Sequence, residues 1–273
     1  MSTMAGPTVV RRQLGRTLKR MRIAAKVSVD QVVAHRELGI SRAKLYRLEA
    51  GQHLAKPQDI VVLCQFLGAS AEEIKRLTAL ALATQGTADA AIPEWFQLYR
   101  DLEQVAAGIR SYDGEVIPGL LQTGDYARAV YRAAQPDHSD EAIEHQVGLR
   151  LERQERFFGR RPAPRLTAIL NQAVLTRPAG DDGIMEAQIE HLHQLDKQAT
   201  VDVGVLPFSA GMHAAMTGAF RILDFDDPDD PNIVYLEAHI GGRYLQKPEE
   251  YAEYGRIWHL IRRTAIPLKE FSP

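Results

Sequence analysis

The residues best suited to chemistry in this sequence lie in one short basic run, Ser-Arg-Ala-Lys-Leu-Tyr-Arg-Leu-Glu, at positions 41–49. A helix that buries Leu45 and Leu48 would turn the basic side chains of this run outward. Arginine and lysine on such a face reach guanine edges or phosphates in the major groove of DNA. We therefore interpret residues 41–50 as a DNA-recognition helix, and the residues expected at the DNA are Gln31, Ser41, Arg42, Ala43, Lys44, Tyr46 and Arg47.

Five short helices between residues 11 and 83 are predicted to position this run. Ser28 and Gln31 have the spacing of a capping box at the start of the second helix, and Ser41 is the expected cap of the third. Gly51 is placed to end the third helix in a left-handed conformation. Because free N–H groups at a helix start bind phosphate, Gln31 and the beginning of the second helix are expected to contact the DNA backbone.

Apolar residues in this region recur at spacings of three and four, which is typical of helices packed around a common core. Pro57 suits the first turn of the fourth helix, and Ser70 with Glu73 forms a capping box for the fifth. An alternative is a small helical bundle that binds protein rather than DNA. The positions expected to face the core are Leu14, Leu18, Met21, Ala25, Val29, Val32, Val33, Leu45, Leu48, Ile60, Leu63, Cys64, Leu67, Ile74, Leu77 and Ala81.

The charge of the chain is divided unevenly along its length. Residues 1–56 hold twelve Lys and Arg against three Asp and Glu, a formal charge of +9, and residues 57–273 carry −11, so the net charge is only −2. A basic segment joined to an acidic one points to a polyanion partner for the basic segment alone. Chance clustering on a solvated surface is the alternative.

The basic region resembles the Xre/Cro family of bacterial helix-turn-helix repressors. The resemblance rests on the pattern S-R-x-x-[IL]-x-R-[IL]-E-x-G, which is matched from Ser41 to Gly51. It implies a mainly α, lambda-repressor-like DNA-binding domain over residues 1–83. The stretch from Ser28 to Ser41 is about two residues longer than is usual in that family, so an irregular turn is expected after Arg36.

A second domain is predicted over residues 93–273, after a linker of small residues at 84–92. Helices followed by short strands predict an α+β domain with a small mixed or antiparallel sheet. Its helices are expected over 95–109, 143–158, 184–197 and 248–265, and its strands over 165–170, 200–208, 219–225 and 232–237, with a hairpin loop at 226–231. The outer face of the 143–158 helix is expected to carry Arg150, Glu152, Arg153, Glu155 and Arg156.

This second region resembles a C-terminal domain of unknown function found in many Xre-like proteins of high-GC bacteria. Members are described as antitoxin-like transcriptional regulators, often paired with a small partner protein encoded nearby, and that role is implied by the resemblance alone. The phrases that carry it are Pro93–Phe96, Ile117–Thr123, Asp125–Ala127, Leu206–Phe208, Gly211 with His213, and Val234–Glu237.

The loop after the 200–208 strand is the candidate ligand or partner site of the second region, because loops beyond strands often carry function. Its members are Pro207, Phe208, Ser209 and His213. The sequence contains no Gly-x-Ser-x-Gly elbow, phosphate loop or His-Glu-x-x-His motif, so we predict no enzyme, no catalytic residue and no cofactor. His191 and His193 point apart on a helix, and no metal site is predicted.

The single cysteine, Cys64, excludes an internal disulfide and suits a reducing compartment. No apolar run is long enough to span a membrane, so a cytoplasmic, nucleoid-associated protein is expected. Apolar residues recur at spacings of three and four over 95–109 and 251–265, and these two apolar seams could be dimer contacts or domain core.

The leading hypothesis is a sequence-specific DNA-binding transcriptional regulator that recognises a palindromic operator as a homodimer. Its second domain would dimerise and receive a small-molecule effector or a small protein partner. One alternative is an antitoxin-like protein whose main activity is binding a small partner protein, and another is a ligand sensor or enzyme in the second domain. The sequence leaves open the operator, the effector, the partner, the dimer surface, and repression versus activation.

Overall fold

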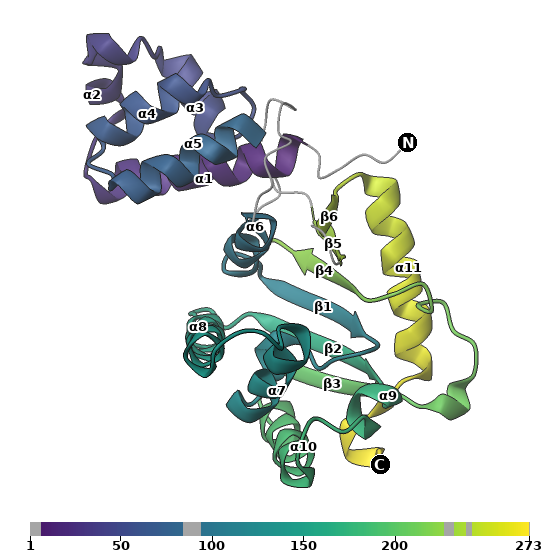
Figure 1. Cartoon of the computed structure of the whole chain (residues 1–273). Coiled ribbons are helices and arrows are strands. Elements are labelled where there is room, and N and C mark those ends of the chain that lie inside the picture. The colour runs from purple at the N-terminus through teal and green to yellow at the C-terminus, as the bar shows by residue number, and fades with distance from the viewer. Residues whose placement is uncertain (1–6, 84–93, 227–231, 239–241, 273) are drawn as a thin grey trace. The chain divides into compact units, whose positions relative to one another are not determined.

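The computed structural model describes residues 7–83, 94–226, 232–238 and 242–272, and the chain separates into two compact units (Figure 1). The N-terminal unit comprises residues 1–102 with 239–244, and the C-terminal unit comprises 103–238 with 245–273. The predicted linker, residues 84–92, lies outside the described residues.

The described part of the N-terminal unit confirms the five helices predicted between residues 11 and 83. They are α1 (Pro7–Ala24), α2 (Val29–Ala34), α3 (Arg42–Glu49), α4 (Pro57–Phe66) and α5 (Ala71–Ala83). The Ser28–Gln31 capping box is present in both directions. The Oγ of Ser70 likewise accepts from the Glu73 backbone N–H at 3.2 Å, and Glu73 Oε2 accepts from the Ser70 backbone N–H at 2.9 Å.

The connection between α2 and α3 contains the irregular turn that the sequence predicts after Arg36. A 3₁₀ helix, η1 (Arg36–Leu38), follows α2, and Gly39 ends it in the left-handed region with φ of 55°. Ser41 then begins α3, with its side chain accepting a hydrogen bond from the Lys44 backbone N–H. The η1 turn thus accommodates the longer connection between the two helices. The N-terminal caps of α2 and α3, Ser28 and Ser41, are both formed.

Most of the predicted core positions of the N-terminal unit are buried, from Leu14 and Leu18 in α1 to Leu77 and Ala81 in α5. Two predictions are wrong, because Ala25 lies beyond the end of α1 and is exposed, and Val33 is 39% exposed. Helix α2 has only six residues, so its narrow inward face buries Val32 alone.

Two glycines allow α1 to cross closely over the end of α3. A Cβ atom on Gly15 would lie 2.4 Å from the Leu48 carbonyl oxygen, and one on Gly51 would lie 2.6 Å from the Arg12 Cα. Gly51 also has a φ of 69°, which confirms the predicted left-handed end of α3. These positions require glycine, because a larger residue would push α1 away from the predicted recognition helix.

The described strands belong to one mixed sheet of seven strands, in the order β6-β5-β4-β1-β2-β3-β7. Strands β1, β2 and β3 are parallel, whereas β1–β4, β4–β5 and β3–β7 are antiparallel. This confirms the predicted α+β class and all four predicted strands. The strands are β1 (Gly108–Asp113), β2 (Arg165–Asn171), β3 (Val201–Leu206), β4 (Phe220–Asp224), β5 (Ile233–Glu237), β6 (Gly242–Leu245) and β7 (Ile266–Pro267).

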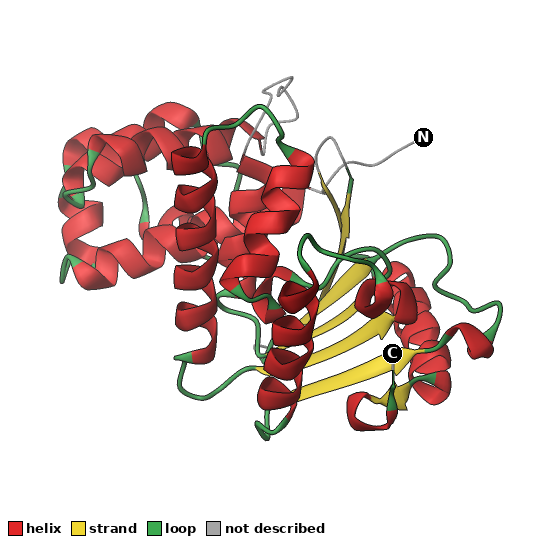
Figure 2. Ribbon diagram, turned by 60° about the horizontal axis from the view of Figure 1, so that its bottom comes forward, coloured by secondary structure: helices red, strands yellow, loops and turns green. Residues whose placement is uncertain are grey.

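Helices cover both faces of this sheet. Figures 1 and 2 show α11 (Pro248–Thr264) on one face, where Trp258 and Ile261 join the core cluster of the sheet. The 251–265 seam is therefore domain core. The remaining described helices are α6 (Glu94–Glu103), α7 (Gly124–Ala134), α8 (Asp140–Phe158), α9 (Gln172–Thr176) and α10 (Asp182–Asp196), of which α7, α8 and α10 lie on the opposite face.

The predicted helix over 95–109 is wrong, because α6 ends at Glu103 and Ile109 belongs to β1. Strand β1 lies in the middle of the sheet and is buried along nearly its whole length. A strand buried on both faces lacks the alternation of polar and apolar residues that marks an exposed one. Leu102 in α6 and Ile109 in β1 are separated by a helical spacing only by coincidence, and this spacing misled the prediction.

The predicted outer face of α8 is confirmed at the exposed residues Glu152, Glu155 and Arg156 and wrong at Arg150 and Arg153. Arg153 is buried, and its Nε and Nη2 each lie 2.6 Å from an oxygen of Glu103, whose side chain is fully buried. The Arg150 guanidinium lies 4.3 Å from the centre of the Tyr131 ring. Phe157 rather than Phe158 enters the core. Arg150 and Arg153, which the sequence placed on the solvent face, instead contact Tyr131 and Glu103 and so bind α8 to neighbouring segments.

The buried position of Cys64 predicts an inert thiol. Burial raises the pKa of Cys64 to about 11, so at pH 8 only about one thiol in a thousand is ionised. We expect no reaction of the native protein with an aromatic disulfide reagent at pH 8 within minutes, and one equivalent per chain in denaturant. Rapid reaction of the native protein would contradict this core position.

Candidate functional site

The predicted recognition helix α3 presents a polar face to solvent. Leu45 and Leu48 are 1% and 2% exposed, so they hold the opposite face of the helix in the core. Among the residues predicted at the DNA, Ser41, Arg42, Ala43, Tyr46 and Arg47 are exposed, and Lys44 is half-buried. The structure therefore brings these six residues together on one helix.

Gln31 and Ser41 already use side-chain oxygens within the protein. Gln31 Oε1 accepts from the Ser28 backbone N–H at 2.7 Å, and Ser41 Oγ accepts from the Lys44 backbone N–H at 3.2 Å. Both residues remain exposed. Their observed role is to cap α2 and α3, which orients the exposed first turns of these helices.

A buried ion pair fastens α3 to α1. Arg22 Nε lies 2.6 Å from Glu49 Oε1, and Arg22 Nη2 lies 2.9 Å from Glu49 Oε2. Their side chains are only 11% and 5% exposed, and the hydrogen bonds to Glu49 raise the pKa of Arg22. Sequence reasoning placed Glu49 in a family pattern but did not identify this partner, which lies 27 positions away.

Two basic residues of α3 are paired with carboxylates of neighbouring helices. Arg42 contacts Asp30 of α2, and Lys44 Nζ lies 2.8 Å from Asp59 Oδ2 of α4. Arg47 donates to the Ala43 carbonyl at 3.3 Å. A phosphate or base that approaches Arg42 or Lys44 must therefore compete with a carboxylate.

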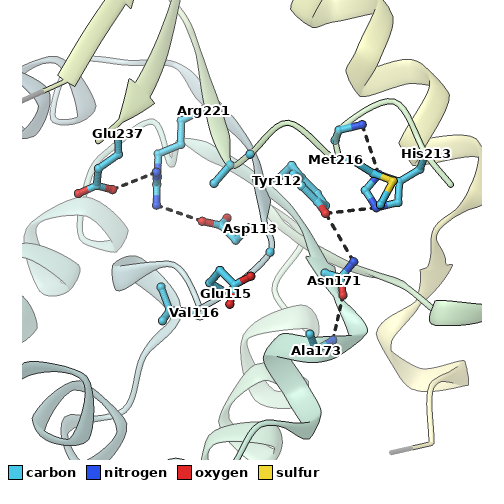
Figure 3. Close-up of a pocket in the computed structure, with 14 residues that line it drawn as sticks. Tyr112, Asp113, Glu115, Val116, Asn171, Ala173, His213, Met216, Arg221 and Glu237 are labelled. Atoms are coloured by element: carbon cyan, nitrogen blue, oxygen red, sulfur yellow. Dashed lines mark hydrogen bonds and ion pairs between the residues drawn. The ribbon is translucent and has the colours of Figure 1, made fainter. Parts of the chain in front are cut away.

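The C-terminal unit contains a cavity of about 300 Å³ at one edge of the sheet (Figure 3). Asp113 ends β1 and Asn171 ends the parallel strand β2, so both lie at the carboxyl edge where ligands bind in sheets with parallel strands. Arg221 comes from the start of β4 and Glu237 from the end of β5, which antiparallel pairing brings to the same edge.

The structure brings one of the four predicted loop residues to this cavity. His213 lines it, whereas Pro207, Phe208 and Ser209 do not, and Phe208 is 60% exposed. Sequence reasoning missed the larger part of the site, namely Tyr112, Asp113, Asn171, Arg221 and Glu237. The available signal was the position of Asn171, Arg221 and Glu237 at the ends of three predicted strands.

Hydrogen bonds orient the two rings in the cavity. The Ala215 backbone N–H donates to His213 Nδ1 at 3.3 Å, so the proton of the neutral imidazole belongs on Nε2, which lies 3.4 Å from Tyr112 Oη. Asn171 Nδ2 donates to the same oxygen at 3.5 Å. Burial lowers the pKa of His213 and raises that of Tyr112, so both rings are neutral at pH 7.

The opposite wall of the cavity carries charge. Arg221 Nη2 lies 3.0 Å from Asp113 Oδ1, and Arg221 Nη1 lies 3.4 Å from Glu237 Oε2. The Asp113 side chain is only 3% exposed. Burial raises the pKa of Asp113, and the charge of Arg221 opposes that shift.

Two structural absences apply to the residues that the structure describes. None of these helices is both long and apolar enough to cross a lipid bilayer. Across the same residues, no three His, Cys, Asp or Glu side chains are grouped as metal ligands would be.

Two parts of the chain match known families. Residues 13–77 match a helix-turn-helix domain, and residues 96–270 match the domain of unknown function DUF5753. No curated protein and no solved structure matches the chain. The helix-turn-helix match indicates DNA binding by the N-terminal unit.

The Arg22–Glu49 pair generates a stability prediction. Glu49→Ala leaves a buried guanidinium without its carboxylate, which costs about 3–5 kcal/mol. We expect hydrogen exchange of the α1 and α3 amides to accelerate at least tenfold, measured by mass spectrometry on the full chain. Glu37→Ala, at an exposed position of η1, is the control. Equal exchange in the two variants would show that the pair does not hold α3.

Proposed function

The chain belongs to the DUF5753 family and carries an N-terminal helix-turn-helix domain, and from this we propose that it is a sequence-specific DNA-binding regulator of transcription of the Xre type. The observation that carries the proposal is the outward face of α3, where Arg42, Tyr46 and Arg47 are exposed above buried leucines. The formal charge of +9 over residues 1–56 supports an anionic partner for this unit.

In the proposed complex, α3 lies in the major groove with its first turn toward the bases. Arg42, Ala43, Lys44 and Tyr46 approach base edges, and Arg47 approaches a base or phosphate. On binding, Arg42 leaves its ion pair with Asp30, Lys44 leaves its ion pair with Asp59, and both side chains contact DNA instead. The capped start of α2, with Gln31, lies against the phosphate backbone.

We propose that the regulator acts as a homodimer on a palindromic operator. Helix-turn-helix proteins commonly bind two half-sites about one helical turn apart, and two-fold symmetry in the protein then matches symmetry in the DNA. The larger C-terminal unit is the proposed source of the dimer interface.

The proposed role of the C-terminal unit is to receive a small-molecule signal in its cavity, rather than to catalyse a reaction. The support is the mutual hydrogen bonding of Tyr112, Asn171 and His213, which fixes these groups as a preformed binding wall.

A second candidate function is binding of a small neighbour-encoded protein, as in an antitoxin. The observation that favours it is the exposure of three large apolar side chains in the loop after β3, Phe208 (60%), Met212 (86%) and Met216 (56%). Co-expression with the neighbouring gene product tests it. We expect the partner to co-purify with the wild-type protein. The double variant Phe208→Ser with Met212→Ser should abolish co-purification, and the control variant Leu260→Ser, on α11, should preserve it. Equal capture by both variants would argue against this surface.

Operator binding tests the principal proposal. Genomic footprinting of the intact protein should identify a palindrome, and Arg42→Ala and Arg47→Ala should each weaken binding to it by about 1–3 kcal/mol if they contact bases. Lys75→Ala, on the exposed surface of α5, is the control and should change affinity by less than half a kcal/mol or so. Unchanged affinity in both arginine variants at moderate salt would exclude α3 as the recognition helix.

The Lys44–Asp59 pair makes a prediction of the opposite sign. Asp59→Asn removes the carboxylate that Lys44 must leave when it contacts DNA, so binding should tighten without any added phosphate contact. Glu72→Gln, on α5, adds the same charge to the unit and is the matched control. Fluorescence anisotropy over a range of salt concentrations measures both. An effect no larger than that of Glu72→Gln would show that Asp59 does not compete with DNA.

A further inference from the structure

We propose that Arg47 of α3 donates two hydrogen bonds to a guanine base, so that each half-site of the operator contains a guanine specified by this residue. This inference rests on the proposed DNA-binding function and names the chemical group that one side chain of that site recognises. Helix α3 carries three basic side chains, Arg42, Lys44 and Arg47, and their surroundings differ. The surroundings of Arg47 suit a base contact best.

Arg47 is the basic residue of α3 that has no carboxylate partner among the residues that the structure describes. Arg42 contacts Asp30 of α2. Lys44 is half-buried, and its Nζ lies 2.8 Å from Asp59 Oδ2. Arg47, by contrast, is exposed. Its guanidinium can therefore contact DNA without the loss of an ion pair.

A hydrogen bond holds the Arg47 guanidinium over the first turn of α3. Its Nε donates to the Ala43 carbonyl oxygen at 3.3 Å, one helical turn earlier. Long side chains on a helix lean toward its N-terminus, and this bond fixes that direction for Arg47. The first turn of a recognition helix is the part that approaches base edges. The guanidinium thus lies at the base-contacting end of α3, although Arg47 itself belongs to the second turn.

The donors that remain on Arg47 match the major-groove edge of guanine. With Nε engaged, the two Nη atoms form no hydrogen bond with the residues that the structure describes, and they present N–H groups in a planar fork. Guanine presents two acceptors side by side in the major groove, O6 and N7. Adenine has an amino donor in place of O6, which would oppose an arginine donor. The fork therefore favours guanine over adenine.

A DNA phosphate is the alternative partner for the same fork, because arginine also binds phosphate through two parallel bonds. A phosphate contact would position the protein without selecting a sequence. The base is favoured by the place of the guanidinium over the first turn. Ala43, which accepts the bond from Arg47, is exposed there and carries only a methyl group, so its side chain leaves room for a base edge.

Selection of binding sites from randomised double-stranded DNA by the full-length protein tests the base contact. We expect the selected half-site to contain a guanine whose preference is lost in Arg47→Ala, while the preferences at other positions remain. Arg47→Gln should change that preference to adenine, because glutamine pairs with adenine N6 and N7. Lys75→Ala, on the exposed surface of α5, is the control and should keep the guanine. A guanine retained in either Arg47 variant, or equal weakening at every position, would overturn the proposal.

Modified DNA locates the contact on the guanine. At the selected position, 7-deazaguanine lacks the N7 acceptor, so it should weaken wild-type binding about fivefold and leave binding by Arg47→Ala unchanged. Neutral methylphosphonates at the neighbouring phosphates should weaken both proteins equally. Fluorescence anisotropy at fixed salt concentration measures these affinities. The reverse pattern, in which only the methylphosphonates distinguish the two proteins, would assign Arg47 to a phosphate and overturn the guanine contact.

The selection also separates failure of this inference from failure of the proposed function. Enrichment of a defined sequence in which no guanine depends on Arg47 would overturn the guanine contact and leave the sequence-specific regulator standing. If the wild-type protein enriched no sequence, the regulator itself would be contradicted, and the guanine contact with it.

Discussion

Burying an ionised carboxylate costs several kcal/mol unless its oxygens receive strong hydrogen bonds, and each unit of this protein meets that constraint with an arginine. Glu49 receives both bonds from Arg22, so the end of the predicted recognition helix is held against α1. Glu103 receives both from Arg153, so the end of α6 is held against α8. A forked guanidinium fixes orientation as well as distance, which an apolar contact does not. The position of α3 relative to its supporting helices depends on this geometry.

Strand pairing imposes a second constraint, which creates the cavity. Because β1 and β2 are parallel and in register, Asp113 and Asn171 end at one edge of the sheet. The antiparallel strands β4 and β5 bring Arg221 and Glu237 to that edge from the opposite chain direction. The loop after β3 adds His213, whose imidazole reaches Tyr112. Five separate segments thus supply one polar wall, and none of them is a motif by itself.

The parts of the fold that sequence predicted well are those controlled by neighbouring residues. The capping boxes at Ser28 and Ser70, the left-handed Gly51 and the leucines of α3 each depend on a few residues in a row. Strand β1 could not be predicted in the same way, since its burial on both faces removes the alternation that marks a strand. Arg153 resembled a surface residue because its partner, Glu103, lies 50 positions away. The cavity was predicted only through His213, because its other walls meet through strand pairing.

The ion pairs of the N-terminal unit show which of its basic side chains are already neutralised by carboxylates. The formal +9 of residues 1–56 counts every basic side chain equally. Arg22 is committed to Glu49 inside the unit, and Arg42 and Lys44 are held by Asp30 and Asp59. The Arg42–Asp30 pair lies at the surface, where ion pairs contribute little stability, so Asp30 can yield to an anion at small cost, whereas the buried Glu49 cannot. The half-buried Lys44–Asp59 pair lies between these two cases. The buried pair therefore fixes the helix, and the more exposed pairs lower the positive charge that α3 presents to solvent.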